Sequence, residues 1–135
     1  MDKYPQTVAV ILRGPNGIFI SERLDTETLS GHHQVAGGRV DPGETFLQAA
    51  VRETQEETEL DISPERFMEV WRGEVATSKE EAIFLVDLTA AEIPGNPEPD
   101  KCTPWVAFEL EHAITGLNLV PSLPPVFRIL PPRAH

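Results

Sequence analysis

Residues 38–60 read GRVDPGETFLQAAVRETQEETEL, and the strongest local pattern in the chain lies here. A turn rich in glycine and proline leads into a helical pattern over residues 45–58, where Thr45 and Gln48 stand at the spacing of a capping box. Residues that can pack in a core recur at steps of three or four along this segment. We expect the core-facing stripe to consist of Leu47, Ala50, Val51, Thr54 and Thr58. The stretch therefore predicts an amphipathic helix behind a tight turn.

Three glutamates share the other face of this helix. Glu53, Glu56 and Glu57 stand three and four residues apart, a spacing that stacks side chains on one side. Like charges at this spacing destabilise an isolated helix by about 0.2–0.5 kcal/mol per pair, so their grouping needs a reason. A divalent cation supplies one, because Mg²⁺ prefers carboxylate oxygens and is completed by substrate phosphates. The alternative is a solvated helix face on which Arg52 pairs with Glu56.

The residues in front of the helix favour the cation. Gly37 and Gly38 can bring a backbone carbonyl and amides close to a ligand, because no side chain obstructs the approach. Glu44 precedes the helix and is near enough in sequence to join the same acidic site. The turn and the helix together predict one acidic centre.

The rest of the chain reads as strands and loops around this helix. Two β-rich runs on either side of a Pro-Asn-Gly turn indicate a hairpin. A second, short helix is expected between residues 121 and 131, with prolines in its first turn. The expected strands cover residues 7–13, 18–20, 34–36, 67–75, 82–88 and 105–110. This order predicts an α/β sandwich with a central mixed sheet, formed by residues 1–135 as a single domain.

Composition excludes several classes of partner. The formal net charge of −11 argues against binding to nucleic acid or to an anionic membrane, because both attract basic surfaces. Cys102 is the single cysteine, which excludes an internal disulfide and multi-cysteine zinc sites. No apolar run is long enough to cross a bilayer, and residues 1–5 lack the features of a signal peptide. We expect a cytoplasmic protein; its oligomeric state, a homodimer included, stays open.

The quoted stretch resembles the Nudix box. That family's pattern is Gly, five residues, Glu, seven residues, Arg-Glu-aliphatic, any residue, Glu-Glu, any residue, Gly-aliphatic. The matching positions are Gly38, Glu44, Arg52, Glu53, Glu56, Glu57 and Leu60. At about 7 % per position, six matched glycine or charged positions would arise by chance on the order of once in 10⁵ sequences. The chain is similar to the small Nudix hydrolases that clean nucleotide pools.

Two positions inside the box depart from the family pattern. Thr54 replaces an aliphatic residue, and its methyl group can still pack. Glu59 replaces the glycine that ends the helix. A left-handed residue 59 with a side chain costs roughly 1 kcal/mol or more, and an acid at a helix C-terminus opposes the helix dipole. We therefore expect a shifted or looser helix end.

The resemblance implies a Nudix-like α/β/α sandwich and a Mg²⁺-dependent pyrophosphohydrolase, with Mn²⁺ as an alternative metal. The implied reaction is attack of water on a phosphoanhydride of a nucleoside triphosphate, which yields the monophosphate and pyrophosphate. The implied metal ligands are Glu53, Glu56, Glu57 and the carbonyl of Gly37. The implied catalytic group adds Arg52, which orients the carboxylates, and Glu44, an outer acid. The general base stays open between Glu53, Glu56 and Glu44.

Substrate contacts and substrate class leave alternatives. Gly38 and Arg23 are expected to bind substrate, although Arg23 can instead pair with Glu22 or Asp25. His32 and His33 can touch base or phosphate, or stay solvated in their loop. The box also serves hydrolases of dinucleotides, nucleotide sugars and ADP-ribose, and a non-catalytic nucleotide-binding module is the alternative from another class. Pool-cleaning relatives often read a purine with a polar side chain near the last helix, where this chain offers Asn118 and Ser122.

Overall fold

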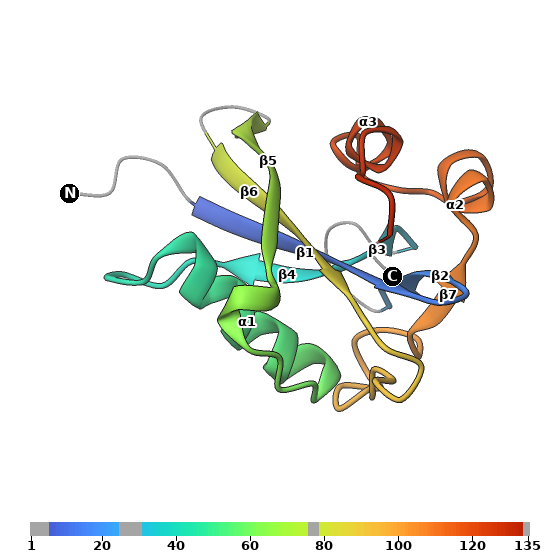
Figure 1. The fold of residues 1–135 in the computed structure, drawn as a ribbon, viewed down its shortest axis with the longest axis horizontal. Helices are drawn as coiled ribbons and strands as arrows, with labels where there is room; N and C mark the ends of the chain where they lie inside the picture. The colour runs from blue at the N-terminus through green and yellow to red at the C-terminus, as the bar shows by residue number, and fades with distance from the viewer. Residues whose placement is uncertain (1–5, 25–30, 76–78, 134–135) are drawn as a thin grey trace.

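A mixed β-sheet forms the centre of the computed structural model, which describes residues 6–24, 31–75 and 79–133 (Figure 1). The strands run in the order β3-β2-β1-β6-β5, while β4 also pairs with β1 and β7 with β2. β1 and β6 are parallel, and the other pairs are antiparallel. The strands are β1 (Gln6–Gly14), β2 (Gly17–Glu22), β3 (His33–Gln34), β4 (Ala36–Arg39), β5 (Met68–Val75), β6 (Lys79–Asp87) and β7 (Val106–Phe108). The expected mixed sheet is confirmed.

Helices cover both faces of the sheet (Figure 1). Val8, Val10 and Leu12 of β1 point to the face covered by α1 (Phe46–Thr58). The alternate residues Ala9 and Ile11 point to the other face, where α2 (Leu110–Gly116) and α3 (Leu123–Arg128) pack. Because β1 is central, its side chains are buried on both faces, and the strand reads as a continuous apolar run. This three-layer arrangement confirms the α/β/α sandwich.

The helix α1 begins as its sequence predicts. The hydroxyl of Thr45 accepts from the backbone N–H of Gln48 at 3.0 Å, and the Gln48 side chain accepts from the backbone N–H of Thr45 at 2.9 Å. This reciprocal capping box satisfies two N–H groups that a helix start leaves unpaired. The helix ends at Thr58, and Glu59 takes the left-handed conformation at φ 64° and ψ 12°. The expected shift of the helix end is therefore wrong, because Glu59 adopts the conformation usually left to glycine.

Three other expectations need correction. Leu47 is 36 % exposed and is not in the core stripe; Phe46 and Ala49 are buried there instead. The expected strand at 105–110 is shorter, since β7 stops at Phe108 and the helix α2 begins at Leu110. The expected strand at 34–36 is divided between β3 and β4. In the two strand cases, pairing with the distant strands β1 and β2 sets the bounds that the local pattern did not predict.

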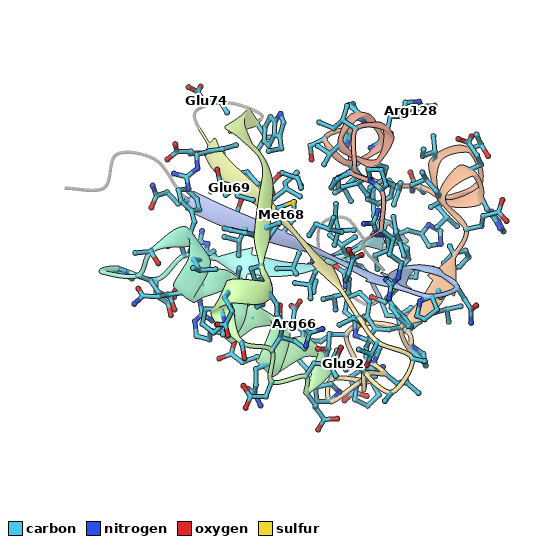
Figure 2. The ribbon with its side chains drawn as sticks, viewed as in Figure 1. Arg66, Met68, Glu69, Glu74, Glu92 and Arg128 are labelled. Atoms are coloured by element: carbon cyan, nitrogen blue, oxygen red, sulfur yellow. The ribbon has the colours of Figure 1, made fainter. Side chains whose placement is uncertain are left out.

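An ion pair links the short 3-10 helix before β5 to the loop that follows β6. The guanidinium of Arg66 donates to both carboxylate oxygens of Glu92, at 2.6 and 2.7 Å, and to the carbonyl of Asp87 at 2.9 Å (Figure 2). Arg66 lies in the short 3-10 helix η1 (Pro64–Arg66) that follows α1. This pair holds the pKa of Glu92 at about 2.

Among the described helices, none is long and apolar enough to cross a membrane.

Candidate active site

Arg52 organises the acidic face of α1. Its Nε and Nη2 donate to the two oxygens of Glu44, at 2.8 and 3.0 Å. Its Nη1 donates to Glu53 at 2.9 Å and to Glu56 at 3.1 Å, and its Nη2 also donates to the carbonyl of Arg39 at 2.9 Å. The planar guanidinium suits such a fork of contacts. Arg52 thus ties the turn before the helix to two of the three glutamates on the helix.

Glu44 belongs to this network through its position just before the helix. Besides Arg52, it accepts from the backbone N–H of Asp41 at 2.9 Å. The hydrogen bonds from Arg52 hold the pKa of the Glu44 carboxyl below its usual range. Glu44 is therefore an ionised group with both oxygens engaged.

Glu53 packs against the backbone of β4. A Cβ atom at Gly38 would lie 2.5 Å from Cδ of Glu53, so no side chain fits between them. The Glu53 side chain is only 13 % exposed, and burial raises its pKa against the opposing effect of Arg52. Gly38 is thus needed for the close approach of a helix carboxylate to a strand.

Glu57 is the most enclosed of the three glutamates. Its Oε1 accepts from the backbone N–H of Gly37 at 2.8 Å. Burial raises the pKa of Glu57 to about 7; the Gly37 hydrogen bond opposes this, and the charges of Glu53 and Glu98 add to it. Two acidic side chains of α1 therefore meet the two consecutive glycines of β4.

Glu98 and Lys101 join the site from the loop between β6 and β7, where no site residue was expected. They line a cavity of about 170 Å³ together with Arg23, Glu57 and Trp105. Lys101 pairs with Glu98 at 3.0 Å. Their acidic and basic side chains in a proline-rich loop were the available signal, but nothing in their spacing relates them to α1.

The carboxylates fit a hard divalent cation in chemistry, but their side chains are not gathered for one. Within residues 6–24, 31–75 and 79–133, no three Asp, Glu, His or Cys side chains converge closely enough to hold a metal. Glu53 and Glu57 face β4, whereas the side chain of Glu56 is 53 % exposed and bound to Arg52. A rotation of Glu56 away from Arg52 would be needed to bring the third carboxylate inward. The donors are oxygen atoms, as Mg²⁺ prefers.

A larger cavity of about 440 Å³ lies on the α3 side of the sheet and reaches Gly37 and Gly38. Arg23 lines both this cavity and the smaller one beside Glu57. Its Nη1 donates to Gln34 at 3.2 Å rather than to Glu22, and its buried Nε has no partner among the described residues. The alternative partner Asp25 lies outside the described residues. His32 and His33 also line this cavity, and Nδ1 of His33 accepts from the backbone N–H of Asn118 at 2.9 Å.

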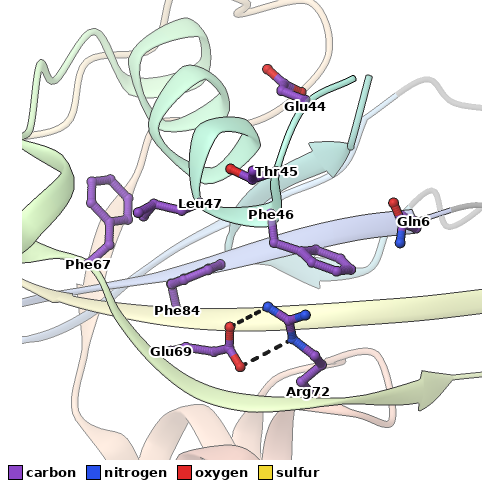
Figure 3. A pocket seen from close by; sticks show the side chains of 9 residues that line it. All are labelled: Gln6, Glu44, Thr45, Phe46, Leu47, Phe67, Glu69, Arg72 and Phe84. Atoms are coloured by element: carbon purple, nitrogen blue, oxygen red, sulfur yellow. Dashed lines mark hydrogen bonds and ion pairs between the residues drawn. The ribbon is translucent and has the colours of Figure 1, made fainter. Parts of the chain in front are cut away.

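A third cavity, of about 570 Å³, opens at the start of α1 (Figure 3). Of the predicted site residues, it contains Glu44. Arg72 also lines this cavity. Its guanidinium lies 4.3 Å from the centre of the Phe46 ring and forms an ion pair with Glu69. The glycines of β4 and the three helix glutamates are not among its lining residues, so it is separate from the acidic site.

Comparisons with known proteins agree with this geometry. The NUDIX domain profile matches residues 3–126. The 8-oxo-dGTP diphosphatase of Escherichia coli (strain K12) is 32 % identical over 124 residues, which cover 73 % of this chain and 94 % of that protein. An RNA pyrophosphohydrolase of Erythrobacter litoralis is 42 % identical over 57 residues, which cover 42 % of this chain and 34 % of that protein. The crystal structure of a MutT NUDIX hydrolase from Burkholderia pseudomallei is similar, with a TM-score of 0.79 at 17 % identity, covering 96 % of this chain and 100 % of that one. The chain therefore belongs to the NUDIX domain family of phosphoanhydride hydrolases.

Proposed function

We propose that this chain is a Mg²⁺-dependent pyrophosphohydrolase that cleaves a nucleoside triphosphate to the monophosphate and pyrophosphate. The observation that carries the proposal is the meeting of Glu53 and Glu57 with Gly37 and Gly38, at one end of a cavity of about 440 Å³. Such a cavity is within the size range of small-molecule sites. A phosphate chain at the glycines would extend toward the acids of α1, and a nucleoside would occupy the cavity.

The proposed metal ligands are Glu53, Glu56, Glu57 and the carbonyl of Gly37. When bound, Mg²⁺, or Mn²⁺ in its place, would neutralise phosphate charge and lower the pKa of a bound water. The negative charges of Glu53 and Glu98 each raise the pKa of Glu57, so Glu57 lies close enough to both acids to be repelled by them. That repulsion supports the proposal, because a divalent cation would relieve it.

Arg52 and Glu44 are proposed to act by positioning. Arg52 binds Glu53 and Glu56 and is held in turn by both oxygens of Glu44. A carboxylate with both oxygens engaged by a guanidinium is a poor proton acceptor. We therefore propose that Glu44 holds Arg52 and that Glu53 or Glu56 accepts the proton of the attacking water.

Arg23 is proposed to bind a phosphate oxygen, with Gly38 allowing the phosphate chain to approach β4. Arg23 stands between the two cavities and has an unpartnered Nε among the described residues. A guanidinium with spare donors suits a phosphate. The buried free thiol of Cys102 fits the proposed cytoplasmic location, where thiols stay reduced.

A panel of compounds tests the proposal. The protein with Mg²⁺ is incubated with canonical and oxidised nucleoside triphosphates, a dinucleotide, a nucleotide sugar and ADP-ribose, and products are separated by chromatography. We expect monophosphate and pyrophosphate from a triphosphate, with turnover lost on addition of a chelator. Glu53→Gln and Glu57→Gln should each lower kcat at least 100-fold, whereas Glu65→Gln, an exposed control on η1, should not.

Each other outcome has a distinct meaning. Faster hydrolysis of a dinucleotide, nucleotide sugar or ADP-ribose would replace the proposed substrate class within the same chemistry. Calorimetric binding of a nucleotide without product would indicate a non-catalytic binding module. Turnover that survives both substitutions would refute the proposed site.

A further inference from the structure

The cavity on the α3 side has a single acidic side chain among its described lining residues. This is Glu81 of β6, which lies on the opposite side of β1 from Gly37 and Gly38. The other polar side chains there include Lys79 and Ser122. An acidic group in a cavity proposed to take an anionic compound suits a ligand part that donates hydrogen bonds.

The register of the sheet gives the separation between Glu81 and the glycines. Thr7 of β1 pairs with Glu81 on one side and with Arg39 of β4 on the other, next to Gly38. Two strand spacings of about 4.8 Å therefore separate β6 from β4, or roughly 10 Å. This distance matches the span of a nucleoside between its base edge and its 5′ phosphate. A base would reach Glu81 when the phosphate chain lies at the glycines.

The carboxylate of Glu81 is held in place while keeping acceptor capacity. Its Oε2 accepts from the hydroxyl of Thr7 at 3.3 Å, and its Oε1 from the hydroxyl of Ser122 at 3.5 Å. Both contacts are long, and each oxygen can accept a second hydrogen bond. Burial raises the pKa of Glu81, while Thr7, Lys79 and Ser122 favour the charged form. The two oxygens can thus receive two parallel donors from a ligand.

The rest of the cavity suits a flat ring. Its apolar lining comes from both sides of the space, from the sheet and from the segment that leads into α3. The apolar residues that line it from the α3 side are Ala9, Val35, Val75, Val120, Pro121 and Leu123; Val8 and Ala36 also border it, but their side chains pack in the core on the α1 side. Apolar walls with a few placed polar groups are typical of a small-molecule site. The walls would cover the faces of a base and leave its edge to Glu81.

We infer that Glu81 determines base specificity by accepting the N1–H and the 2-amino group of a guanine base, so that guanine nucleotides are the preferred substrates. Guanine presents two adjacent donors on its Watson–Crick edge. Adenine presents an acceptor beside its amino group, and hypoxanthine lacks the 2-amino group. The inference rests on the proposed function, because it assumes that a nucleotide occupies this cavity.

The test compares three bases in two assays. The first is kcat/KM with dGTP, dITP and dATP, and the second is calorimetric Kd for dGMP, dIMP and dAMP, which needs no turnover. We expect dGTP to exceed dITP about tenfold and dATP about 100-fold, because a missing donor leaves a buried acceptor unpaired. Glu81→Gln should reduce the dGTP to dATP ratio at least tenfold, and Glu81→Asp should reduce it by shortening the reach.

A neighbouring glutamate provides the matched control. Glu80 lies on the same strand, and its carboxylate accepts from the side chain of Gln6 at 2.9 Å, outside the cavity lining. Glu80→Gln should leave the kcat/KM ratios among dGTP, dITP and dATP unchanged. Thermal unfolding of each variant shows whether the fold is kept.

The outcomes separate this inference from the proposed function. Equal kcat/KM and equal Kd for the three bases, or a guanine preference that survives Glu81→Gln, would overturn the role of Glu81 while hydrolysis stands. Preferential binding of dGMP that Glu81→Gln removes, without any turnover, would support Glu81 and overturn the hydrolase. Failure to bind or hydrolyse any of the six nucleotides would overturn both.

Discussion

Replacing Glu59 by glycine should stabilise the protein by about 1 kcal/mol. Glu59 has φ 64° and ψ 12°, and its backbone N–H donates to the carbonyl of Gln55 at 2.9 Å. A left-handed residue with a side chain costs roughly 1–2 kcal/mol, which glycine avoids. Glycine also gives the unfolded chain more freedom, which removes about 0.4–1 kcal/mol of that gain. Loss of a negative charge at the helix C-terminus adds about 0.3 kcal/mol.

Urea unfolding at 25 °C, followed by far-UV circular dichroism, measures this gain. The midpoint should rise at an unchanged m value. With an unfolding entropy of about 2.1 cal/mol/K per residue over 135 residues, 1 kcal/mol corresponds to a rise in Tm of roughly 3–4 °C. Calorimetry of the same samples checks that figure.

Two further variants separate backbone strain from charge. Glu59→Gln removes the charge and keeps the side chain, so it should gain only about 0.3 kcal/mol. Glu59→Asn should fall between Gln and Gly, because asparagine tolerates the left-handed region better than most residues. If Glu59→Gly is no more stable than Glu59→Gln, or is less stable than the wild type, the argument from strain at residue 59 is refuted.

Three other changes test the site and the loop. Gly38→Ala should lower kcat/KM at least tenfold, since the new methyl group displaces Glu53; an unchanged value would show that this close approach does not matter. Arg52→Lys should reduce kcat more than it raises KM, because lysine lacks the planar fork of donors. A rise in KM with kcat unchanged would contradict a positioning role. Glu92→Gln should cost about 1 kcal/mol of unfolding free energy at neutral pH. It weakens the ion pair with Arg66, and the partial exposure of both side chains to solvent keeps the loss small. Because the pKa of Glu92 falls from 4.5 to about 2 on folding, the difference from wild type should be full above pH 4.5 and vanish as the pH falls toward 2; urea titrations across that range would show a constant difference if the reasoning is wrong.

Much of the candidate site could be predicted because its spacing is local. The capping box at Thr45 and the common face of Glu53, Glu56 and Glu57 follow from helical geometry within four residues. The two glycines were expected to let the backbone approach a ligand, and the structure adds that Gly38 leaves room for the Glu53 carboxylate. Whether these acids hold a metal remains the proposal that the nucleotide assay tests.

The remaining features depend on contacts between distant segments. Glu98 reaches Glu57 from a loop, and Glu81 faces the same cavity as Gly38 because β6 and β4 pair on opposite sides of β1. Leu110 starts a helix although its neighbours read as a strand. No periodicity of 2 or 3.6 residues encodes such neighbours.

The amino-acid order by itself determined the hairpin, the capped helix and its acidic face, since each arises from interactions over a few residues. The tertiary structure alone decided that Glu59 turns left-handed, that Arg52 joins Glu44 to the helix acids, and that Glu81 shares a cavity with Gly38. The reason is that strand pairing and packing place groups far apart in the chain side by side, at free-energy gains that exceed the local backbone preference of about 1–2 kcal/mol.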